Sequence, residues 1–477
     1  MSRMRPLGIA VMVVACLVGL CSPAAQATIA PPPPIDWPTF GFDLARSGFN
    51  PNETQLTPAT VPNLRLRWST ELDGGVMIGQ PVVAAGVPVD GVRRTVVYEG
   101  TEHGELAALD AATGEVLWHQ ELGSVETACN DTPDGVFGIG GGAAIDRARG
   151  WLYVAGGDGA VHAFGLANGV ERAHWPVEGV FDPTEIHDYG GLTYDPGTGK
   201  LYVTFAGHCD INPYHGKITS IDVATHEVRK EFYPSGPVVN GGGIWGPGGV
   251  SIDLATHHVF TATGNARRHP ETYRYSEAMV ELSSSLTPLG SDQPPLEGND
   301  VDFGATPLLF DPPGCPGFAA VMNKTGSLFL YERGGVDDGA VQRLQISREG
   351  SGHFQGIPAW SPRTGDVYLT DDGDSPDGVY RHGLIALHVG TGCRLRLAWQ
   401  RTFGSGGFAY PAPTVAGDVV YAADGAGDEV RAWVSSSGRL LWSSGIQVEG
   451  AAFVAPTVVD GMVLVPSWDG RLACFSL

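Results

Sequence analysis

One short unit returns eight times along the chain, and this repetition limits the possible folds more than any other feature. Its clearest copy, GELAALDAATGEVLW at Gly104–Trp118, has a glycine, an alternating run, a Thr-Gly turn and a second run that holds tryptophan. The other copies are Gly159–Arg172, Gly216–Lys230, Ala278–Gly290, Gly326–Val341, Gly383–Trp399, Glu429–Trp442 and the stretch that starts at Gly470. Their starts lie roughly 42 to 60 residues apart, which is the spacing of β-propeller blades.

A second repeat leads to the same count. Before each unit stands a lead-in of small residues followed by a short apolar strand, as in GGAAID at Gly141 and GGVSID at Gly248. Small residues suit strands that pack closely around a narrow axis. We therefore predict an all-β fold, an eight-bladed β-propeller whose blades are four-stranded antiparallel sheets.

The last unit is incomplete, because the chain reaches Leu477 before a strand with tryptophan can follow. The segment Leu64–Leu72, LRLRWSTEL, has the character of that strand and belongs to no other unit. We expect this N-terminal strand to pair with the C-terminal blade and close the ring, which removes exposed strand edges.

The N-terminus has the features of a secretory signal peptide. Two arginines precede the apolar run Leu7–Leu20, which is too short to span a bilayer comfortably, and a small-residue cleavage site ends at Ala27. The predicted organisation is a signal peptide at 1–27, a proline-rich linker at 28–36 and a single eight-bladed propeller at 37–477. We thus expect an exported protein, periplasmic or extracellular, that is cleaved near Ala27 and has no membrane span.

Charge and cysteine content set further limits. The formal net charge is −23, so the acidic surface disfavours binding to nucleic acid. Outside the predicted signal peptide lie five cysteines, Cys129, Cys209, Cys315, Cys393 and Cys474. An odd number in an exported protein predicts some disulfides and at least one free thiol. The sequence leaves their connectivity open.

Chemically unusual side chains gather where the first strands of blades begin and the second strands end, and these ends share one rim of a propeller. The candidates are Asp210 after the second strand of blade three, Trp245 and Asn265 in blade four, and Asp300, Asp302 and Lys324 in blade five. Carboxylate and amide oxygens are ligands for Ca²⁺. A further carboxylate can act as a general base, and an ammonium group can stabilise a developing oxyanion. The tryptophan, in a glycine-rich run, offers a floor for a planar ligand.

Each candidate also has a purely structural interpretation. Asn265, after Thr-Gly, suits a left-handed turn position, and the two aspartates of blade five can cap loop amides. Trp245 can fill the core, and Lys324 in Lys-Thr-Gly can be a solvated turn residue. Asp210 can simply flank a disulfide at Cys209. The shared rim favours the functional interpretation.

The repeats resemble those of pyrroloquinoline quinone (PQQ) proteins, eight-bladed propellers in which tryptophans dock neighbouring blades. Trp68, Trp118, Trp399 and Trp442 match that docking pattern. The resemblance covers nearly all of residues 37–477. The segments VDFGATP and GHCDINPYHG are most similar to exported polyvinyl-alcohol-dehydrogenase-like proteins and related uncharacterised propellers.

The resemblance to quinoprotein alcohol dehydrogenases implies cofactor-binding roles. Trp245 in NGGGIWG is similar to the tryptophan that stacks on the quinone, and Lys324 in NKTGSLFLYER to a basic residue that contacts it. Asn265 in ATGN would bind Ca²⁺. Asp210 would stand in for the calcium glutamate that usually follows Ser-Gly-Ala, and the family's disulfide between adjacent cysteines has no counterpart here.

The same resemblance implies a dehydrogenase that oxidises an alcohol or sugar hydroxyl, on a small or polymeric substrate, with PQQ and Ca²⁺ in the funnel. Asp302 in VDFGATPLLF, or Asp300 nearby, takes the place of the catalytic aspartate. The sequence has no C-x-x-C-H haem motif, so electrons would pass to a separate acceptor such as a cytochrome. The alternative is a non-catalytic propeller that acts as a protein-interaction scaffold in the cell envelope.

Overall fold

The computed structural model describes residue 1 and residues 35–129, 134–266, 275–298, 300–348, 354–371, 373–402, 409–424, 428–448 and 455–477. Apart from Met1, the predicted signal peptide lies outside the described residues, as does nearly all of the predicted linker. Residues Pro34–Leu477 form one compact unit.

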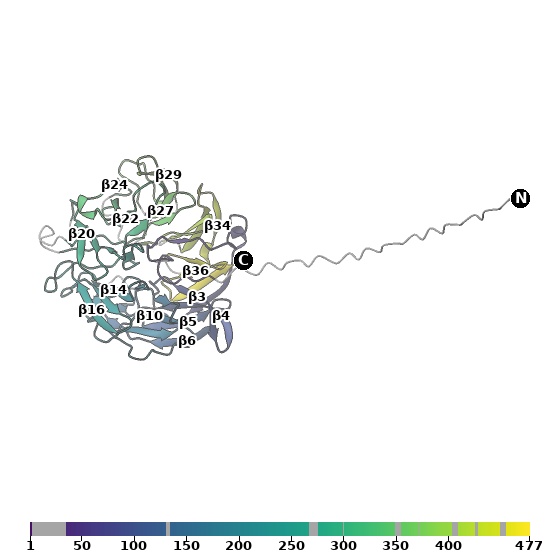
Figure 1. The fold of residues 1–477 in the computed structure, drawn as a ribbon, viewed down its shortest axis with the longest axis horizontal. Helices are drawn as coiled ribbons and strands as arrows, with labels where there is room; N and C mark the ends of the chain where they lie inside the picture. Colours follow the sequence, from purple (N-terminus) through teal and green to yellow (C-terminus); the bar gives the residue numbers. More distant parts are fainter. Residues whose placement is uncertain are drawn as a thin grey trace. The chain divides into compact units, whose positions relative to one another are not determined.

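Within the described residues of this unit, eight β-sheets of three to five strands follow one another around a central axis, and two further sheets, β7-β8 and β25-β30, have two strands each (Figure 1). This arrangement confirms the predicted all-β, eight-bladed propeller. Sheets one to four contain β3 (Val82–Val89), β4 (Val92–Gly100), β5 (Glu105–Asp110) and β6 (Val116–Glu121); β9 (Ala144–Asp146), β10 (Trp151–Ala155) and β11 (Val161–Gly165); β13 (Thr193–Asp195), β14 (Lys200–Gly207), β15 (Lys217–Asp222) and β16 (Glu227–Phe232); and β17 (Ser251–Ile252), β18 (Val259–Ala262), β19 (Met279–Leu282) and β20 (Pro288–Asp292).

Sheets five to eight repeat the antiparallel pattern of neighbouring strands. They contain β21 (Leu308–Phe310), β22 (Phe318–Asn323), β23 (Ser327–Glu332) and β24 (Gln342–Gln345); β26 (Ala359–Ser361), β27 (Asp366–Asp371), β28 (Gly383–Val389) and β29 (Leu395–Arg401); β31 (Thr414–Ala416), β32 (Val419–Asp424), β33 (Glu429–Val434) and β34 (Leu440–Ser443); and β35 (Thr457–Val459), β36 (Met462–Pro466), β37 (Arg471–Ser476) and β2 (Arg65–Glu71). The remaining short elements are β1 (Phe49–Asn50), β7 (Val125–Glu126), β8 (Val136–Phe137), β12 (Ile186–His187), β25 (Phe354–Gln355), β30 (Ala409–Tyr410) and the 3-10 turns η1 (Val61–Asn63), η3 (Val336–Asp338) and η4 (Gly445–Gln447).

Sheet two departs from the predicted four strands, since its described residues form three. Its fourth strand is reduced to a bridge between Phe164 and Glu171, and the chain pairs with β11 again only where Val177 bridges Val161. Pro176 lies between these two bridges and has no amide hydrogen with which to continue a ladder. The proline explains why a full outer strand does not form here.

The eighth sheet combines the two ends of the propeller sequence. Strand β2 pairs antiparallel with β37, and Trp68 lies opposite Cys474 in this pairing. The N-terminal part of the chain therefore supplies the outer strand of the sheet that the last residues build.

Four tryptophans connect neighbouring sheets by donating an indole hydrogen bond to a backbone carbonyl of the next sheet. The four bonds run from Trp68 to Ala111 (2.9 Å), from Trp118 to Leu166 (3.1 Å), from Trp399 to Ser435 (2.9 Å) and from Trp442 to Leu64 (3.2 Å). For Trp68, Trp118 and Trp399, a glycine of the receiving sheet lies beneath the indole. At Gly169, a Cβ atom would come within 2.6 Å of the Trp118 ring. At these three places the Thr-Gly, Asn-Gly or Ser-Gly turn of the repeat thus makes room for the preceding tryptophan.

Substituting this glycine is expected to destabilise the propeller. Gly169→Ala puts a methyl group in a left-handed position (φ +61°) and against the Trp118 ring. Gly150→Ala is the matched control, because Gly150 is also left-handed (φ +68°) but has no atom near its Cβ position. The left-handed conformation costs each variant about 1–2 kcal/mol. The clash should lower the free energy of unfolding of Gly169→Ala by about 1–3 kcal/mol more. Equal losses in chemical denaturation would contradict this.

An N-terminal stretch, which we call the axial segment (residues 37–50), contacts all eight sheets in chain order. The contacts, at or beside each sheet's first strand, join Trp37 to Val83, Pro38 to Ile145, Thr39 to Leu192, Leu44 to Ile252, Ala45 to Leu309, Ser47 to Trp360, Gly48 to Val415 and Asn50 to Val458. Each is a hydrogen bond, and most join backbone to backbone. The axial segment therefore satisfies polar groups on the inner edges of the sheets.

The structure also shows how the five cysteines outside the predicted signal peptide are paired. Disulfides join Cys129 to Cys209 and Cys315 to Cys393, and Cys474 is a buried free thiol.

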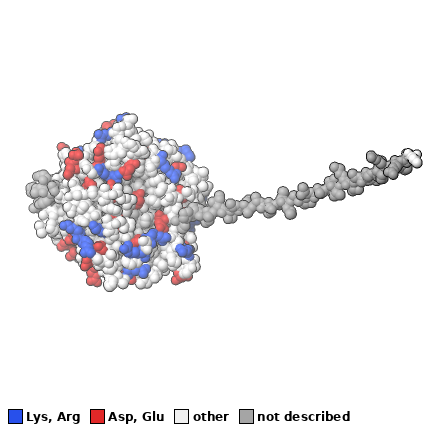
Figure 2. Space-filling view, viewed as in Figure 1, with Lys and Arg blue, Asp and Glu red and all other residues white. Residues whose placement is uncertain are grey.

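On the face that Figure 2 shows, acidic and basic side chains are interspersed. None of the helices in the described part of the chain has the length and apolarity to cross a membrane.

Candidate functional site

The six candidate side chains line one cavity of about 250 Å³. Its wall contains Asp210, Trp245, Asn265, Asp300, Asp302 and Lys324, together with Tyr189, Cys209, Tyr214 and the small residues Ala206, Gly207, Gly243 and Gly264. The six lie after β14, before β17, after β18, before β21 and after β22. The structure thus brings together every residue that the sequence singled out, while their chemical roles stay predictions.

Asp302 is the most deeply buried ionisable group of the six, with 5% of its surface exposed. The Trp245 indole Nε1 donates to its Oδ2 at 3.0 Å, and the Lys324 ammonium lies 3.3 Å from its Oδ1. Burial raises the pKa of Asp302 to about 7, against the opposing effect of Lys324. Asp302 therefore exchanges a proton near neutral pH, as a general base at that pH must.

Asp300 lies beside Asp302 but ionises very differently. Lys324 Nζ donates to its Oδ1 at 2.9 Å, and Asn265 Nδ2 donates to the same oxygen at 3.2 Å. Burial alone would raise the pKa of Asp300, but hydrogen bonds from Asp302 and Lys324 outweigh it and lower the pKa to about 2. Two neighbouring carboxyls with separated pKa values are the arrangement that divides catalytic roles in many enzymes.

Lys324 and Trp245 form the floor of the site. The ammonium lies 4.8 Å from the indole centroid, within range of a cation–π contact. Burial would lower the pKa of Lys324, but Asp302 and Asp300 raise it, so the group stays charged. Gly304 lets the indole pack against the backbone, since a Cβ there would come within 2.2 Å of the ring.

Asn265 and Asp210 form another part of the polar lining, next to Asp300. The Asn265 Oδ1 is buried and has no hydrogen-bond partner, while its Nδ2 lies 3.5 Å from Asp210 Oδ2. Asp210 also accepts a hydrogen bond from the Tyr214 hydroxyl. An unpartnered amide oxygen beside carboxylates fits a hard cation such as Ca²⁺. Within the described ranges no three His, Cys, Asp or Glu side chains form a metal site, so such an ion would need the amide oxygen and further oxygens from water or ligand.

Sequence analysis did not identify Tyr189 or Tyr214 as cavity residues, and it considered Cys209 only as a cysteine beside Asp210 that can form a disulfide. Tyr189 belongs to IHDYGG, the lead-in to sheet three, and the rule that found Trp245 would have found it too. Tyr214 lies in a loop between β14 and β15, and a repeat pattern cannot predict the path of a loop. A disulfide at Cys209 and the hydrogen bond to Asp210 set that path.

Known proteins with similar sequences include quinone-dependent dehydrogenases. A polyvinylalcohol dehydrogenase of Pseudomonas sp. is 24% identical over 514 residues, which cover 92% of this chain and 75% of that protein. The alcohol dehydrogenase (quinone), dehydrogenase subunit, of Komagataeibacter europaeus is 27% identical over 207 residues, 42% of this chain. That match spans only 25% of the subunit's length.

A solved structure shows the same fold. The crystal structure of quinohemoprotein alcohol dehydrogenase from Comamonas testosteroni superposes with a TM-score of 0.69 at 17% identity, over 92% of this chain and 80% of that one. The family model of PQQ repeats described as outer membrane protein assembly factor BamB matches residues 63–231 and 383–476. Because the match covers more than half of the chain, the protein belongs to this PQQ-repeat family, as the repeats indicate.

Proposed function

We propose that this protein is an exported, quinoprotein-like dehydrogenase that oxidises an alcohol or sugar hydroxyl. The observation that carries the proposal is the pair Asp302 and Asp300 beneath one ammonium group, Lys324, with pKa values of about 7 and about 2. An ionisable group such as the Asp302 carboxyl is expensive to bury, and a propeller that only presents its outer surface has no need of one. The similarity to dehydrogenases over most of the chain supports the same reaction class.

Residues present in the cavity suit the cofactors of such an enzyme. Trp245 and Lys324 would hold PQQ, one as an aromatic surface and the other as a cation. Asn265 and Asp210 would hold Ca²⁺ through their oxygens. When bound, PQQ supplies a two-electron acceptor and Ca²⁺ a Lewis acid.

The protein's own side chains would manage the proton. Asp302 takes it from the substrate hydroxyl, because its carboxylate is buried and has a pKa near the working pH. The Trp245 N–H orients this carboxylate through Oδ2. Lys324 stabilises negative charge that develops beside it, and the permanently ionised Asp300 keeps Lys324 protonated.

Cavity size limits what enters. About 250 Å³ is below the roughly 300–1,000 Å³ of sites that enclose drug-sized ligands. A polymeric substrate would therefore present a single hydroxyl-bearing portion from solvent. Electrons would leave to a separate acceptor such as a cytochrome.

Titration of the purified mature protein with PQQ and Ca²⁺ tests the proposal. We expect quinone absorbance to co-elute with the protein and a dye to be reduced in the presence of alcohols. Trp245→Ala should lose the quinone, whereas Trp151→Ala, in β10 and outside the cavity lining, should keep it. No binding at micromolar PQQ would contradict the proposal. N-terminal sequencing of the exported protein, expected to begin at Thr28, tests the cleavage site.

The family description favours one alternative, a non-catalytic scaffold in the cell envelope. A scaffold would bind through exposed surface and would not depend on the buried carboxyl. Under this alternative, Asp302→Asn leaves the protein's cellular role intact. Loss of that role in Asp302→Asn, with the fold unchanged, would exclude the scaffold.

A further inference from the structure

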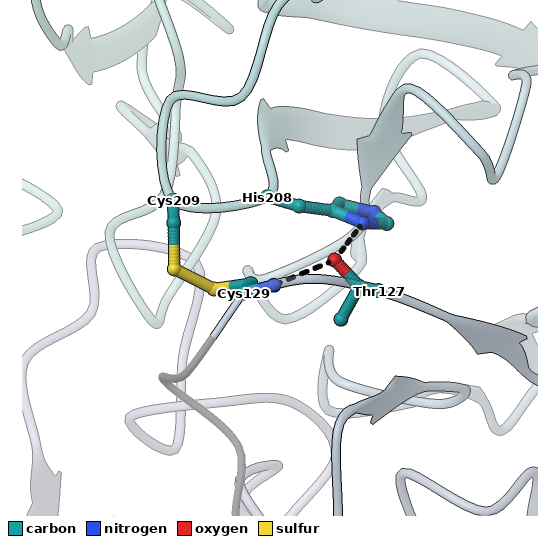
Figure 3. The surroundings of a disulfide bond; sticks show 4 residues. All are labelled: Thr127, Cys129, His208 and Cys209. Atoms are coloured by element: carbon teal, nitrogen blue, oxygen red, sulfur yellow. Dashed lines mark hydrogen bonds between the residues drawn. A yellow bond between two sulfur atoms is a disulfide. The ribbon is translucent and has the colours of Figure 1, made fainter.

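The disulfide Cys129–Cys209 (Figure 3) belongs in part to the cavity wall, because Cys209 is one of the lining residues. Cys129 follows β7, in the connection between sheets one and two, and Cys209 follows β14 in sheet three. The bond spans 80 residues of sequence, and Cys209 itself lines the cavity. Cys129 is buried whereas Cys209 is exposed, so the bond can be reached from solvent on one side.

Asp210 depends on the backbone that this disulfide holds. Cys209 and Asp210 both have left-handed backbone conformations, with φ of 49° and 55°. Such conformations are unfavourable for a residue other than glycine and persist where the surroundings enforce them. The Asp210 carboxylate then reaches Tyr214 and Asn265.

The residues around the disulfide reinforce this connection. Thr127 Oγ1 accepts a hydrogen bond from the Cys129 amide at 3.1 Å and is hydrogen-bonded to His208 Nδ1, also at 3.1 Å (Figure 3). His208 is 4% exposed and its ring contacts Phe137. The segment before Asp210 is therefore fixed to the segment that carries Cys129 by one covalent and one hydrogen-bonded connection.

The second disulfide provides a contrast within the same molecule. Cys315 lies between β21 and β22, and Cys393 between β28 and β29, with a separation of 78 residues. In antiparallel sheets these connections lie at the opposite rim from the cavity. Neither cysteine lines the cavity. Cys315–Cys393 therefore ties sheets five and six without touching the site.

We propose that Cys129–Cys209 is a positioning disulfide, which holds the Asp210 carboxylate at the cation site and releases it when the bond is reduced. A dithiol reductant would supply two electrons and two protons, the S–S bond would break into two thiols, and the reductant would become a disulfide. Cation binding in the cavity thereby becomes sensitive to redox conditions. This inference rests on the proposed function, since it assigns Asp210 to a Ca²⁺ site.

Calorimetric titration with Ca²⁺ alone tests the proposed role of the disulfide in two variants, each of which lacks one of the two disulfides. Cys129→Ser/Cys209→Ser should lose about tenfold or more in Ca²⁺ affinity, whereas Cys315→Ser/Cys393→Ser should stay within about twofold of the wild type. Adding Asp210→Asn to each pair completes a double-mutant cycle. Asp210→Asn should change the Ca²⁺ affinity little in Cys129→Ser/Cys209→Ser and should lower it about tenfold in Cys315→Ser/Cys393→Ser. Additive losses would show that the disulfide acts by general stabilisation and would overturn the proposal.

Hydrogen–deuterium exchange of residues 207–216 separates this proposal from the proposed function. If the wild type binds no Ca²⁺, the calcium assignment fails, but exchange still reports on positioning. We expect faster exchange of this segment in Cys129→Ser/Cys209→Ser, and in wild type treated with dithiothreitol, with unchanged exchange in Cys315→Ser/Cys393→Ser. Unchanged exchange in the first pair would overturn the inference whatever binds in the cavity.

Discussion

Replacing Asp302 with asparagine is expected to lower kcat by about 10²- to 10⁴-fold, the usual contribution of a general base, while PQQ binding persists. The amide has nearly the same volume and keeps one oxygen, which can still accept from the Trp245 N–H, while its NH₂ group takes the place of the oxygen that faces Lys324. Steady-state dye reduction measures the loss, and quinone absorbance measures retained cofactor. Asp300→Asn is the matched comparison, because a carboxyl with a pKa of about 2 is a weak base. A larger loss in Asp300→Asn would reverse the assignment.

The burial of Asp302 also predicts how the activity and the stability of the wild type and of Asp302→Asn depend on pH. Asp302 acts as a base only when ionised, so kcat/KM should rise with pH through an ionisation near 7, and Asp302→Asn should lack this rise. The free energy of unfolding of the wild type should fall, not rise, over the pH range in which Asp302 becomes ionised. In the metal-free protein the folded-state pKa is raised above the ordinary 3.8, so ionisation costs folding free energy. The wild type should lose stability relative to Asp302→Asn as pH rises from about 4 to 7.

Arg46→Met is expected to lower the free energy of unfolding by about 3–5 kcal/mol, the usual cost of removing one member of a buried charged network. Arg46 belongs to the axial segment and is 1% exposed. Its guanidinium donates to the carbonyls of Phe40 (2.7 Å) and Val250 (3.1 Å), and to the Thr39 (2.6 Å) and Thr193 hydroxyls. Methionine fills the space but leaves these acceptors without donors.

A surface arginine is the control for this prediction. Arg363 pairs with Asp418 at 3.3 Å, and both side chains are exposed. Arg363→Met should change the free energy of unfolding by about 1 kcal/mol or less. Chemical denaturation measures both variants, and similar losses would contradict the assigned importance of Arg46. Burial raises the pKa of Asp43 and the charge of Arg46 lowers it, so the defect of Arg46→Met should grow as the pH rises through the ionisation of Asp43.

The repeat predicted the architecture well, because turn and strand signals are local and each occurs eight times. It also predicted that the six candidate residues lie together, since alternating strand direction places lead-ins and second-strand exits on one rim. Asp210 and Lys324 are 114 residues apart in sequence, with Asn265 between them, yet all three line one cavity. Local pattern plus fold symmetry was enough for that inference.

Features that depend on long-range or one-off contacts could not be predicted. The reduced outer strand of sheet two follows from Pro176, whose effect depends on where the chain after Glu171 pairs again with β11. The pairing of Cys129 with Cys209 requires knowing which loops meet, and five cysteines allow many pairings. The axial segment has no repeat signature, because each of its contacts uses a different residue.

That segment changes how the propeller should fold. In a simple repeat array each unit contacts only its neighbours, and stability is nearly a sum of local contributions. Here the residues translated just after the predicted linker bind the inner strands of every sheet, including Val458, 408 positions after Asn50. Contacts of such separation are slow to form and couple distant units. The eight blades should therefore unfold as one cooperative body, and a chain truncated before its last sheet should leave the axial segment without part of its partners.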